Sequence, residues 1–400
     1  MDWPIERICF LTNYNSYNAK RYFTQGLSEA CERLGIATMI IDVAERGLDQ
    51  TLLRELLAFH PTLTASFHSI LPMRHGPFLW DHLELPHWAI WVDATLYATE
   101  LINSPYCILS CVDRDDEKLL KAQGCEKSFF MAHGVARREE PISYENRPYD
   151  VLMAATCYDY EGFRQFWREA LPLQEQQLLE EAVDQLFTPG TTVTMMEALA
   201  NAWQAAPLAH SPIDVQRLFF LLDYYCRGRD RVALARAFEK SHLHLFGSLS
   251  EDHVANQRGW DYYLGDSSQV TLHPPVGYEE MGALLRKSKI CLNSVISFRN
   301  GCHERVIEGM LYGAIPLSSS SFWLEEQFVA GEELLLYRQG EEKVQAQRAE
   351  ALIADAEAWQ QMAQRGQDKV LAYHTWDAKL PGVVKELSRC LKIIYEGQGS

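Results

Sequence analysis

The sequence predicts an α/β protein made of two Rossmann-like domains that face a cleft, with a helical insertion in the second domain. Three observations lead to this prediction. The chain has 400 residues with 47% hydrophobic content, which exceeds what one hydrophobic core usually organises. Short apolar runs alternate with segments of helical period along most of the chain. A long, purely helical stretch interrupts that alternation near residues 158–240. A cleft between two domains is the natural place for a ligand.

The first domain is expected at residues 1–140. Strand-like runs alternate there with helix-period segments, which predicts right-handed crossovers and a parallel sheet covered on both faces. The expected helices are 19–35 and 49–59, and the expected strands are 7–13, 36–42, 63–69, 87–93, 106–113 and 127–134.

A polar segment with two prolines at 135–148 is predicted to be a linker to a second domain at 149–378. After a strand at 149–156, residues 158–240 carry the helical insertion. The remaining expected strands are 242–247, 269–275, 289–295 and 314–319, with helices at 278–288 and 303–312. From about residue 341 the chain is helical, and its last segment, 379–400, is expected to pack back across both domains.

Composition excludes several classes of protein. The net charge of -17, from 37 basic and 54 acidic residues, would repel a phosphate backbone, so nucleic acid is not expected as a partner. The ten scattered cysteines form no C-x-x-C pair and are interpreted as buried thiols of a reducing cytosol. The N-terminus does not resemble a signal peptide, and no apolar stretch approaches the roughly 20 residues of a membrane helix. A cytoplasmic protein with at most peripheral membrane contact is expected.

The most informative stretch is SFRNGCHERVIEGMLYGAIPLSS, from Ser297 to Ser319. Gly301 permits a sharp turn after a strand, and Gly313 is well placed to end a helix. A helix therefore begins near the carboxyl edge of the sheet, where its free N–H groups suit a diphosphate. Arg299 and Arg305 flank this helix start and could bind phosphate oxygens. The alternative is that Arg305 pairs with Glu308 on a solvent-exposed face.

The helix carries further candidate contacts. His303 and Glu304 lie in its first turn, and Glu308 follows one turn later. A carboxylate at this place can accept both hydroxyls of a ribose. The alternative for Glu304 is that it complements the helix dipole.

Four pieces of sequence, HERVIEGMLYGAIPLSS, VLMAATCYDYEGFR, HLHLFGS and YHTWDAKLPGVV, resemble in order the C-terminal half of group 1 (GT4-related) glycosyltransferases, especially the CgeB-like branch. The resemblance covers residues 150–395 apart from the insertion, and residues 1–135 only loosely. It implies a GT-B fold and transfer of a sugar, by default from a UDP-sugar, to an acceptor that is a glycan, a protein or a small molecule. It also implies that neither a metal nor a cofactor is needed.

The resemblance also implies roles for individual residues. Glu308 matches the ribose-binding glutamate of the family, and Arg305 and Arg164 would contact the diphosphate. The first acid of the E-x7-E pattern falls on Asn300, a departure that leaves donor sugar and stereochemistry open. Gly247 would make a glycine turn beside the donor, and Tyr278 would stack on the nucleotide base.

Three residues of the first domain are candidates for the catalytic base that an inverting transfer requires. Asp93, His68 and His133 each end an expected strand at the carboxyl edge of the sheet. The alternatives are a helix cap for Asp93 and hydrogen-bonded wall residues for the histidines.

Two further stretches of the first domain are open to more than one interpretation. The loop from Thr12 to Asn18 lacks the glycines of a dinucleotide fingerprint; its amides and phenols suit hydroxyl-rich ligands, although turn formation is the simpler explanation. The aromatic stretch from Phe78 to Trp91 is either core or an acceptor platform.

The sequence leaves two rival functions open. A sugar-nucleotide epimerase or hydrolase would share the donor site. A degenerate GT-B subunit would bind a protein partner through the helical insertion.

Overall fold

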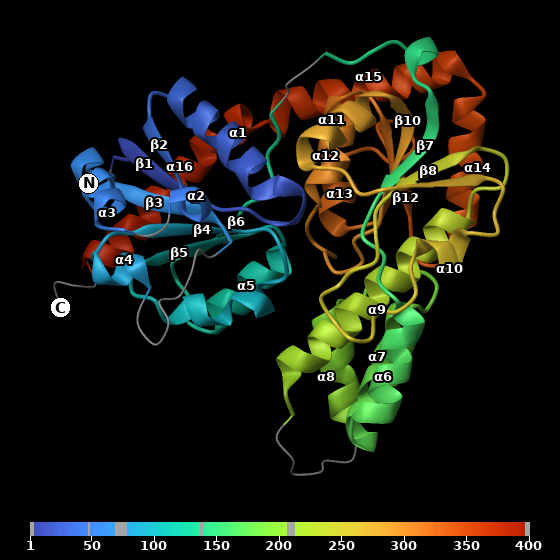
Figure 1. Ribbon diagram of the computed structural model, residues 1–400, viewed down its shortest axis with the longest axis horizontal. Coiled ribbons are helices and arrows are strands. Elements are labelled where there is room, and N and C mark those ends of the chain that lie inside the picture. Colours follow the sequence, from blue (N-terminus) through green and yellow to red (C-terminus); the bar gives the residue numbers. More distant parts are fainter. Residues whose placement is uncertain (1–3, 47–48, 69–77, 137–139, 206–212, 397–400) are drawn as a thin grey trace. The chain divides into compact units, whose positions relative to one another are not determined.

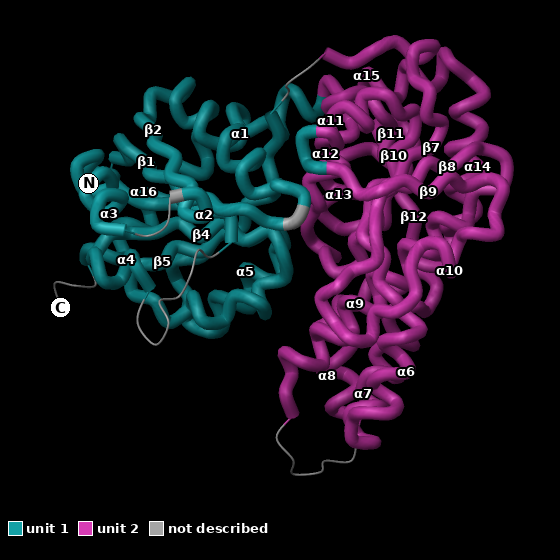
Figure 2. Tube along the Cα trace, viewed as in Figure 1, with its two compact units in different colours: residues 1–138, 277–279, 369–400 teal, residues 139–276, 280–368 magenta. Residues whose placement is uncertain are grey.

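The computed structural model describes residues 4–46, 49–68, 78–136, 140–205 and 213–396. It divides into two compact units (Figures 1 and 2). Unit 1 comprises residues 1–138, 277–279 and 369–400, and unit 2 comprises residues 139–276 and 280–368. The first boundary lies within the expected linker. The division near the C-terminus falls at residue 368 and assigns the final helix to unit 1.

Unit 1 is a parallel six-stranded sheet of order β2-β1-β3-β4-β5-β6. Its strands are β1 (Arg7–Thr12), β2 (Ala37–Asp42), β3 (Leu63–Phe67), β4 (His87–Trp91), β5 (Cys107–Cys111) and β6 (Ser128–Phe130). Its helices are α1 (Ala19–Arg33), α2 (Val43–Arg46), α3 (Gln50–Phe59), α4 (Leu79–His82), α5 (Arg114–Ala122) and α16 (Trp376–Glu396), with 3-10 turns at Ser16–Asn18 and Thr95–Asn103.

Side chains that alternate along β1 explain why helices cover both faces of this sheet. Ile8 and Phe10 pack with residues of α1 and α16, whereas Cys9 and Leu11 pack against α3. The last helix, α16, contributes seven buried residues to the unit 1 core: Trp376, Leu380, Val383, Leu387, Cys390, Leu391 and Ile394. A bidentate ion pair from Arg33 to Asp377, at 2.6 and 2.8 Å, fastens α1 to α16.

The aromatic stretch from Phe78 to Trp91 belongs to this core. Trp80 and Trp88 are at most 1% exposed, and the Trp80 ring stacks on His87 at 3.8 Å between centroids. The interpretation as an acceptor platform is therefore wrong for these rings, because their faces are occupied by protein.

Unit 2 is a second parallel six-stranded sheet, of order β12-β11-β10-β7-β8-β9. Its strands are β7 (Tyr149–Ala154), β8 (Leu243–Phe246), β9 (Val270–His273), β10 (Ser288–Asn293), β11 (Ile315–Ser319) and β12 (Leu335–Tyr337). Its helices are α6 (Tyr160–Ala170), α7 (Leu173–Leu186), α8 (Met195–Ala205), α9 (Val215–Arg236), α10 (Trp260–Leu264), α11 (Tyr278–Arg286), α12 (Glu304–Leu311), α13 (Phe322–Gln327), α14 (Glu342–Ile353) and α15 (Ala356–Tyr373), with a 3-10 turn at Tyr144–Asn146.

Helices again cover both faces of the unit 2 sheet. One face packs on α9, α10, α14 and α15, and the other packs on α11 and on Tyr312 at the end of α12. Helices α6 to α9 fill the segment where the sequence indicated an insertion, and they project from the sheet as a bundle (Figure 1). The α/β fold class with two parallel sheets is confirmed.

The order of strands in each sheet marks one place where neighbouring crossovers leave in opposite directions. In unit 1 this switch point lies between β1 and β3, and in unit 2 it lies between β7 and β10. Open parallel sheets bind ligands outside the carboxyl ends of the strands at such points. Each unit therefore has one place where a ligand is expected from topology alone.

Candidate functional site

The start of α12 in unit 2 is capped by the side chain of His303. Its Nδ1 atom lies 3.4 Å from the backbone N of Arg305, which donates to it, and 3.2 Å from Oε2 of Glu304. One ring nitrogen cannot accept from Arg305 and donate to Glu304 in the same protonation state. Neutral His303 caps the helix, whereas protonated His303 forms an ion pair with Glu304. The free positive end of α12 is therefore partly occupied by this ring.

A cluster of arginines lies beside this helix start. Arg231 of α9 is 8% exposed and donates through Nη1 to the carbonyl of Thr156, just beyond β7, at 2.7 Å. Burial lowers the pKa of Arg231, and the positive charges of Arg227 and Arg305 lower it further. The Nε–H of Arg305 is buried without a hydrogen-bond partner among the described residues. A concentration of positive charge with an unused donor is a local environment that stabilises a bound anion.

The placement of Arg231 follows from the packing of α9 against the carboxyl edge of the sheet. Neighbouring Asp230 is fully buried and accepts from Ser294 Oγ at 2.5 Å, Tyr337 OH at 2.7 Å and Gln339 Nε2 at 3.0 Å. Ser294 follows β10, and Tyr337 ends β12. This network fixes the middle of α9 over the switch point between β7 and β10, so that Arg231 lies at the position where ligands bind such sheets.

Sequence analysis did not single out Arg231, because it lies within the stretch 158–240 that was assigned only as a helical insertion. The signal was present in the segment RGRDR from Arg227 to Arg231, which places four charged residues within five positions of the helix. Two residues of this segment take part in buried polar contacts. Arg227 forms an ion pair with the fully buried Asp223 at 2.8 Å, and Asp230 accepts the hydrogen bonds from Ser294, Tyr337 and Gln339.

The predicted donor-binding residues of α12 and its preceding loop lie together within unit 2. Glu308 is 2% exposed and Glu304 is 9% exposed. Gly301 accepts a hydrogen bond from Ser321 Oγ at 2.7 Å through its carbonyl, which ties the loop to the end of β11. Asn300 is partly buried in the same loop. The segment is thus positioned by hydrogen bonds at a strand end.

Arg299 precedes this loop and is 5% exposed. Its Nε donates to the carbonyl of Val193 at 3.3 Å, and its Nη2 is buried without a partner among the described residues. Burial lowers its pKa, and the charge of Asp230 opposes this shift. Arg299 also lines a small cavity with Ser320, Ser321 and other residues.

Arg164 lies on α6, where its Nε and NH2 donors engage Glu180 of α7. It lines a cavity of about 370 Å³ with Tyr160, Arg168 and Tyr225. The predicted contact of Arg164 with a diphosphate remains a prediction. Its bonds in this structure hold two helices of the insertion together.

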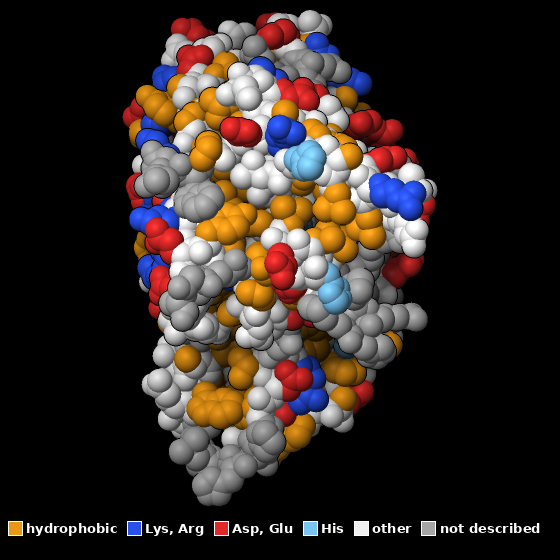
Figure 3. Space-filling model, turned by 90° about the vertical axis from the view of Figure 1, so that its left-hand side faces the viewer, with side chains coloured by type: hydrophobic (Ala, Val, Ile, Leu, Met, Phe, Trp, Pro, Cys, Tyr) orange, Lys and Arg blue, Asp and Glu red, His pale blue; other side chains and the backbone are white. Residues whose placement is uncertain are grey.

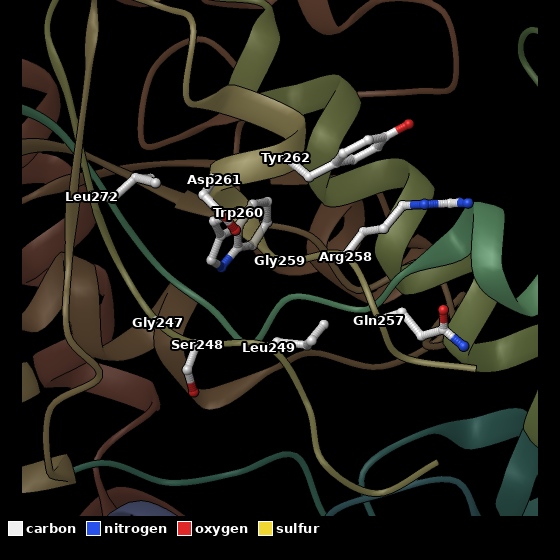
Figure 4. Close-up of a pocket in the computed structure, with 10 residues that line it drawn as sticks. All are labelled: Gly247, Ser248, Leu249, Gln257, Arg258, Gly259, Trp260, Asp261, Tyr262 and Leu272. Atoms are coloured by element: carbon white, nitrogen blue, oxygen red, sulfur yellow. The ribbon is translucent and has the colours of Figure 1, made fainter. Parts of the chain in front are cut away.

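Gly247 follows β8 and lines the cavity of about 510 Å³ shown in Figure 4. A Cβ atom at this position would lie 1.9 Å from the carbonyl oxygen of Ala155, so glycine is needed for the close approach of two strand ends. Trp260 lines the same cavity and donates to that carbonyl at 3.1 Å. Arg258 and Tyr262 point to one side of the cavity in this view.

Tyr278 begins α11 and is 6% exposed. Residues 277–279 group with unit 1, where the Tyr278 ring lies 4.6 Å from Phe23 and 4.9 Å from Tyr22 between centroids. The predicted stacking on a nucleotide base remains a prediction.

In unit 1 the structure brings two predicted catalytic residues together. His68 Nε2 lies 3.4 Å from Asp93 Oδ2, and the His68 ring packs on Trp91 at 4.8 Å between centroids. Burial lowers the pKa of His68, while the negative charge of Asp93 opposes this shift and the positive charge of Lys20 adds to it. His68 also has φ +60°, an uncommon backbone conformation outside glycine. A neutral histidine beside a carboxylate is a suitable arrangement for accepting a proton.

His133 is placed differently from His68. It is 2% exposed, and its Nδ1 lies 2.6 Å from the carbonyl of Gly134. Phe23, Phe67 and Trp376 surround its ring, and burial lowers its pKa to about 3. His133 is therefore a neutral residue in an aromatic cage.

The described residues offer neither a metal site nor a membrane span. No group of three or more His, Cys, Asp or Glu side chains among them is arranged to hold a metal ion. No described helix combines the length and hydropathy needed to cross a membrane. On the face drawn in Figure 3, basic side chains lie scattered among acidic and apolar ones and form no continuous patch within the described part of the chain.

Comparison with known families gives a match in the second half of the chain. Residues 229–382 match the family described as glycosyl transferase-like. This segment runs from the middle of α9, including Arg231, through α12 to the start of α16. No curated protein sequence matches the chain.

Solved structures give the fold. Sucrose-phosphate synthase from Thermosynechococcus elongatus is similar over 98% of this chain and 100% of its own, with 11% identity and a TM-score of 0.53. Anabaena HepE, in complex with UDP and glucose, matches 96% of this chain and 100% of its own at 10% identity and a TM-score of 0.49. AviGT4, a glycosyltransferase of avilamycin A biosynthesis, matches 97% and 98% at 11% identity and a TM-score of 0.48. Together with the two parallel sheets, the likeness to the synthase shows that the chain has the GT-B fold.

Proposed function

We propose that this protein is a group 1 glycosyltransferase, related to the CgeB-like branch, that transfers a hexose from a UDP-sugar to an acceptor. The observation that carries the proposal is the arginine cluster at the switch point of unit 2, within a segment that matches the glycosyl transferase-like family. The name of the structurally similar synthase, whose product is a sucrose phosphate, agrees with this class of reaction.

The diphosphate of the donor is proposed to bind Arg231, Arg305 and the start of α12, with the ribose hydroxyls on Glu308. During transfer the bond from the anomeric carbon to the diphosphate oxygen breaks, and negative charge develops on the leaving diphosphate. Fixed guanidinium groups in a site shielded from water stabilise such charge. Because two arginines supply this positive charge, we propose that the reaction needs no divalent metal.

The acceptor is proposed to bind unit 1 beside His68 and Asp93. The acceptor oxygen forms a bond to the anomeric carbon, and its proton passes to the His68 and Asp93 pair. His68 is the better base of the two histidines, because the ring of His133 is enclosed by aromatic side chains.

Calorimetry with UDP tests the donor site. Replacing Glu308 by Ala should raise the UDP dissociation constant at least tenfold, about 1.4 kcal/mol, and Arg231→Met should do the same by removing a charged hydrogen bond to phosphate. Arg348→Met, which removes an exposed arginine of α14 in the same unit, is the matched control and should leave the affinity unchanged. Equal affinity in wild type and both site variants would refute the assignment.

Product analysis by NMR then separates the rival functions. Transfer gives a new glycoside and UDP in equal amounts, and EDTA should not slow it. An epimerase would convert the donor without an acceptor, and a hydrolase would release free sugar. A protein that binds no nucleotide would instead fit the degenerate subunit, with the helical insertion as its binding surface.

A further inference from the structure

The loop after β1 in unit 1 carries polar atoms that the fold does not use. Thr12 Oγ1, Asn13 Oδ1 and Asn18 Oδ1 are buried without hydrogen-bond partners among the described residues, and Thr12 is only 4% exposed. Buried polar groups are paired in the great majority of cases. These three oxygen atoms, close together in the sequence, therefore indicate a ligand that supplies hydroxyl donors.

These atoms lie at the switch point of unit 1. Phe10 pairs with Ala65 in β3, and Phe67 pairs with Ile90 in β4. When these registers are continued past the strand ends, Asn13, His68 and Trp91 fall at the same level. The unpaired oxygen atoms thus share the carboxyl edge of the sheet with the His68 and Asp93 pair.

The ammonium group of Lys20 belongs to the same part of unit 1, at a position where the positive end of a helix disfavours a cation. Lys20 is the second residue of α1, whose first turn has no acidic residue, so its charge opposes the positive end of the helix. Burial lowers the pKa of Lys20, and only the charge of Asp93 opposes this shift. Among the described residues, no carboxylate lies within ion-pair distance of its ammonium group.

The other charged groups that face Lys20 do not neutralise it. His68 lies close enough for the charge of Lys20 to lower the pKa of His68. Asp93 is shared, because its Oδ2 also contacts His68 Nε2 at 3.4 Å. One carboxylate therefore faces two groups that carry or accept a proton, and a second anion would balance the charge of the cluster.

From this geometry we infer that the acceptor is a polyhydroxylated anion, a sugar phosphate or a sugar acid, whose anionic group binds Lys20 and whose hydroxyls bind the loop from Thr12 to Asn18. The inference rests on the proposed function and names its acceptor class. The hydroxyls would donate to Asn13 and Asn18, which explains the polar composition of a loop that has no glycine. The reacting hydroxyl would then lie beside His68 and Asp93.

Binding to the full-length protein tests this inference without any donor. Saturation-transfer NMR and calorimetry are run with glucose 6-phosphate, glucuronate and glucose. Wild type should bind at least one of the two anions tenfold or more tightly than glucose, and the two anions distinguish a phosphate site from a carboxylate site. Lys20→Met should abolish this preference, whereas Lys20→Arg should restore part of it. Lys392→Met, which removes an exposed charge from α16 of the same unit, should keep it.

The outcomes separate this inference from the proposed function. Equal binding of the anions and glucose to wild type, or an undiminished preference in Lys20→Met, would overturn the inference and leave UDP binding by unit 2 untouched. If wild-type protein does not bind UDP in calorimetry, the proposed function is refuted instead. The Tm of Lys20→Met should be equal to or higher than that of wild type, because methionine removes a charge that opposes the positive end of α1. A folded variant keeps the binding result interpretable.

Discussion

The network around Asp230 provides a quantitative test of how α9 is held on unit 2. Asp230→Ala removes the acceptor of three hydrogen bonds, from Ser294, Tyr337 and Gln339, and leaves their donors buried. Each unsatisfied buried donor costs about 1–3 kcal/mol, and the substitution leaves three such donors, while it also removes a buried carboxylate whose desolvation opposes folding. We therefore expect a loss of about 4 kcal/mol in the free energy of unfolding of unit 2.

For a unit of this size, about 4 kcal/mol corresponds to a decrease in Tm of roughly 8–16 °C, which differential scanning calorimetry can measure. Asp266→Ala replaces an exposed aspartate of the same unit and should change Tm by no more than about 2 °C. Tyr337→Phe should cost about 1 kcal/mol alone and less in the Asp230→Ala background. Strict additivity of these two substitutions, or a Tm of Asp230→Ala within about 2 °C of wild type, would refute the network as a source of stability.

Three further predictions concern stability and accessibility. Burial lowers the pKa of His87 and of His133 to about 3, whereas a histidine of the unfolded chain has a pKa of about 6.5. Between these two pH values the unfolded chain binds more protons than the folded protein, so the free energy of unfolding should fall with decreasing pH by about 1.4 kcal/mol per pH unit for each histidine. A urea midpoint that does not change over that pH range would contradict this. Gly247→Ala should reduce the yield of folded protein, because the added Cβ would meet the carbonyl oxygen of Ala155. Gly382→Ala adds a Cβ in open space inside α16 and should raise the free energy of unfolding by about 0.5–1 kcal/mol. Similar chemical denaturation curves for the two variants would contradict the close approach of Gly247 to Ala155. All ten cysteines are buried free thiols, so a thiol reagent should label the native protein slowly and the unfolded protein at ten sites, and rapid labelling of the native state would contradict the burial.

The fold was predictable because its strands are apolar runs bounded by clear turn residues. The runs at β1, β4 and β10 are largely buried on both faces, and such runs are typical of central parallel strands. The proximity of His68 and Asp93 was only partly predictable. Both end strands of one sheet, but the 3.4 Å contact depends on the pairing of β3 with β4, which one sequence does not reveal.

The residues that the sequence analysis missed were overlooked for two physical reasons. Arg231 and Asp230 lie on a helix that carries many core contacts, and helical periodicity does not indicate which polar residue faces a strand end. Lys20 was missed because a lysine in the first turn of an amphipathic helix is ordinarily exposed to solvent. Arg164 was named through the family resemblance, and its pairing with Glu180, sixteen residues later, depends on the packing of α6 on α7, which one sequence does not reveal.

The contribution of α16 to the core of unit 1 affects how the chain is made. The ribosome completes the strands of this unit more than two hundred residues before Trp376 and Leu387 are synthesised. At about 5–20 residues per second, the apolar groove between α1 and the sheet waits roughly 10–50 s for its last helix. Nascent unit 1 is therefore a natural client for chaperones, and any truncation before Trp376 should yield aggregates instead of a smaller folded protein.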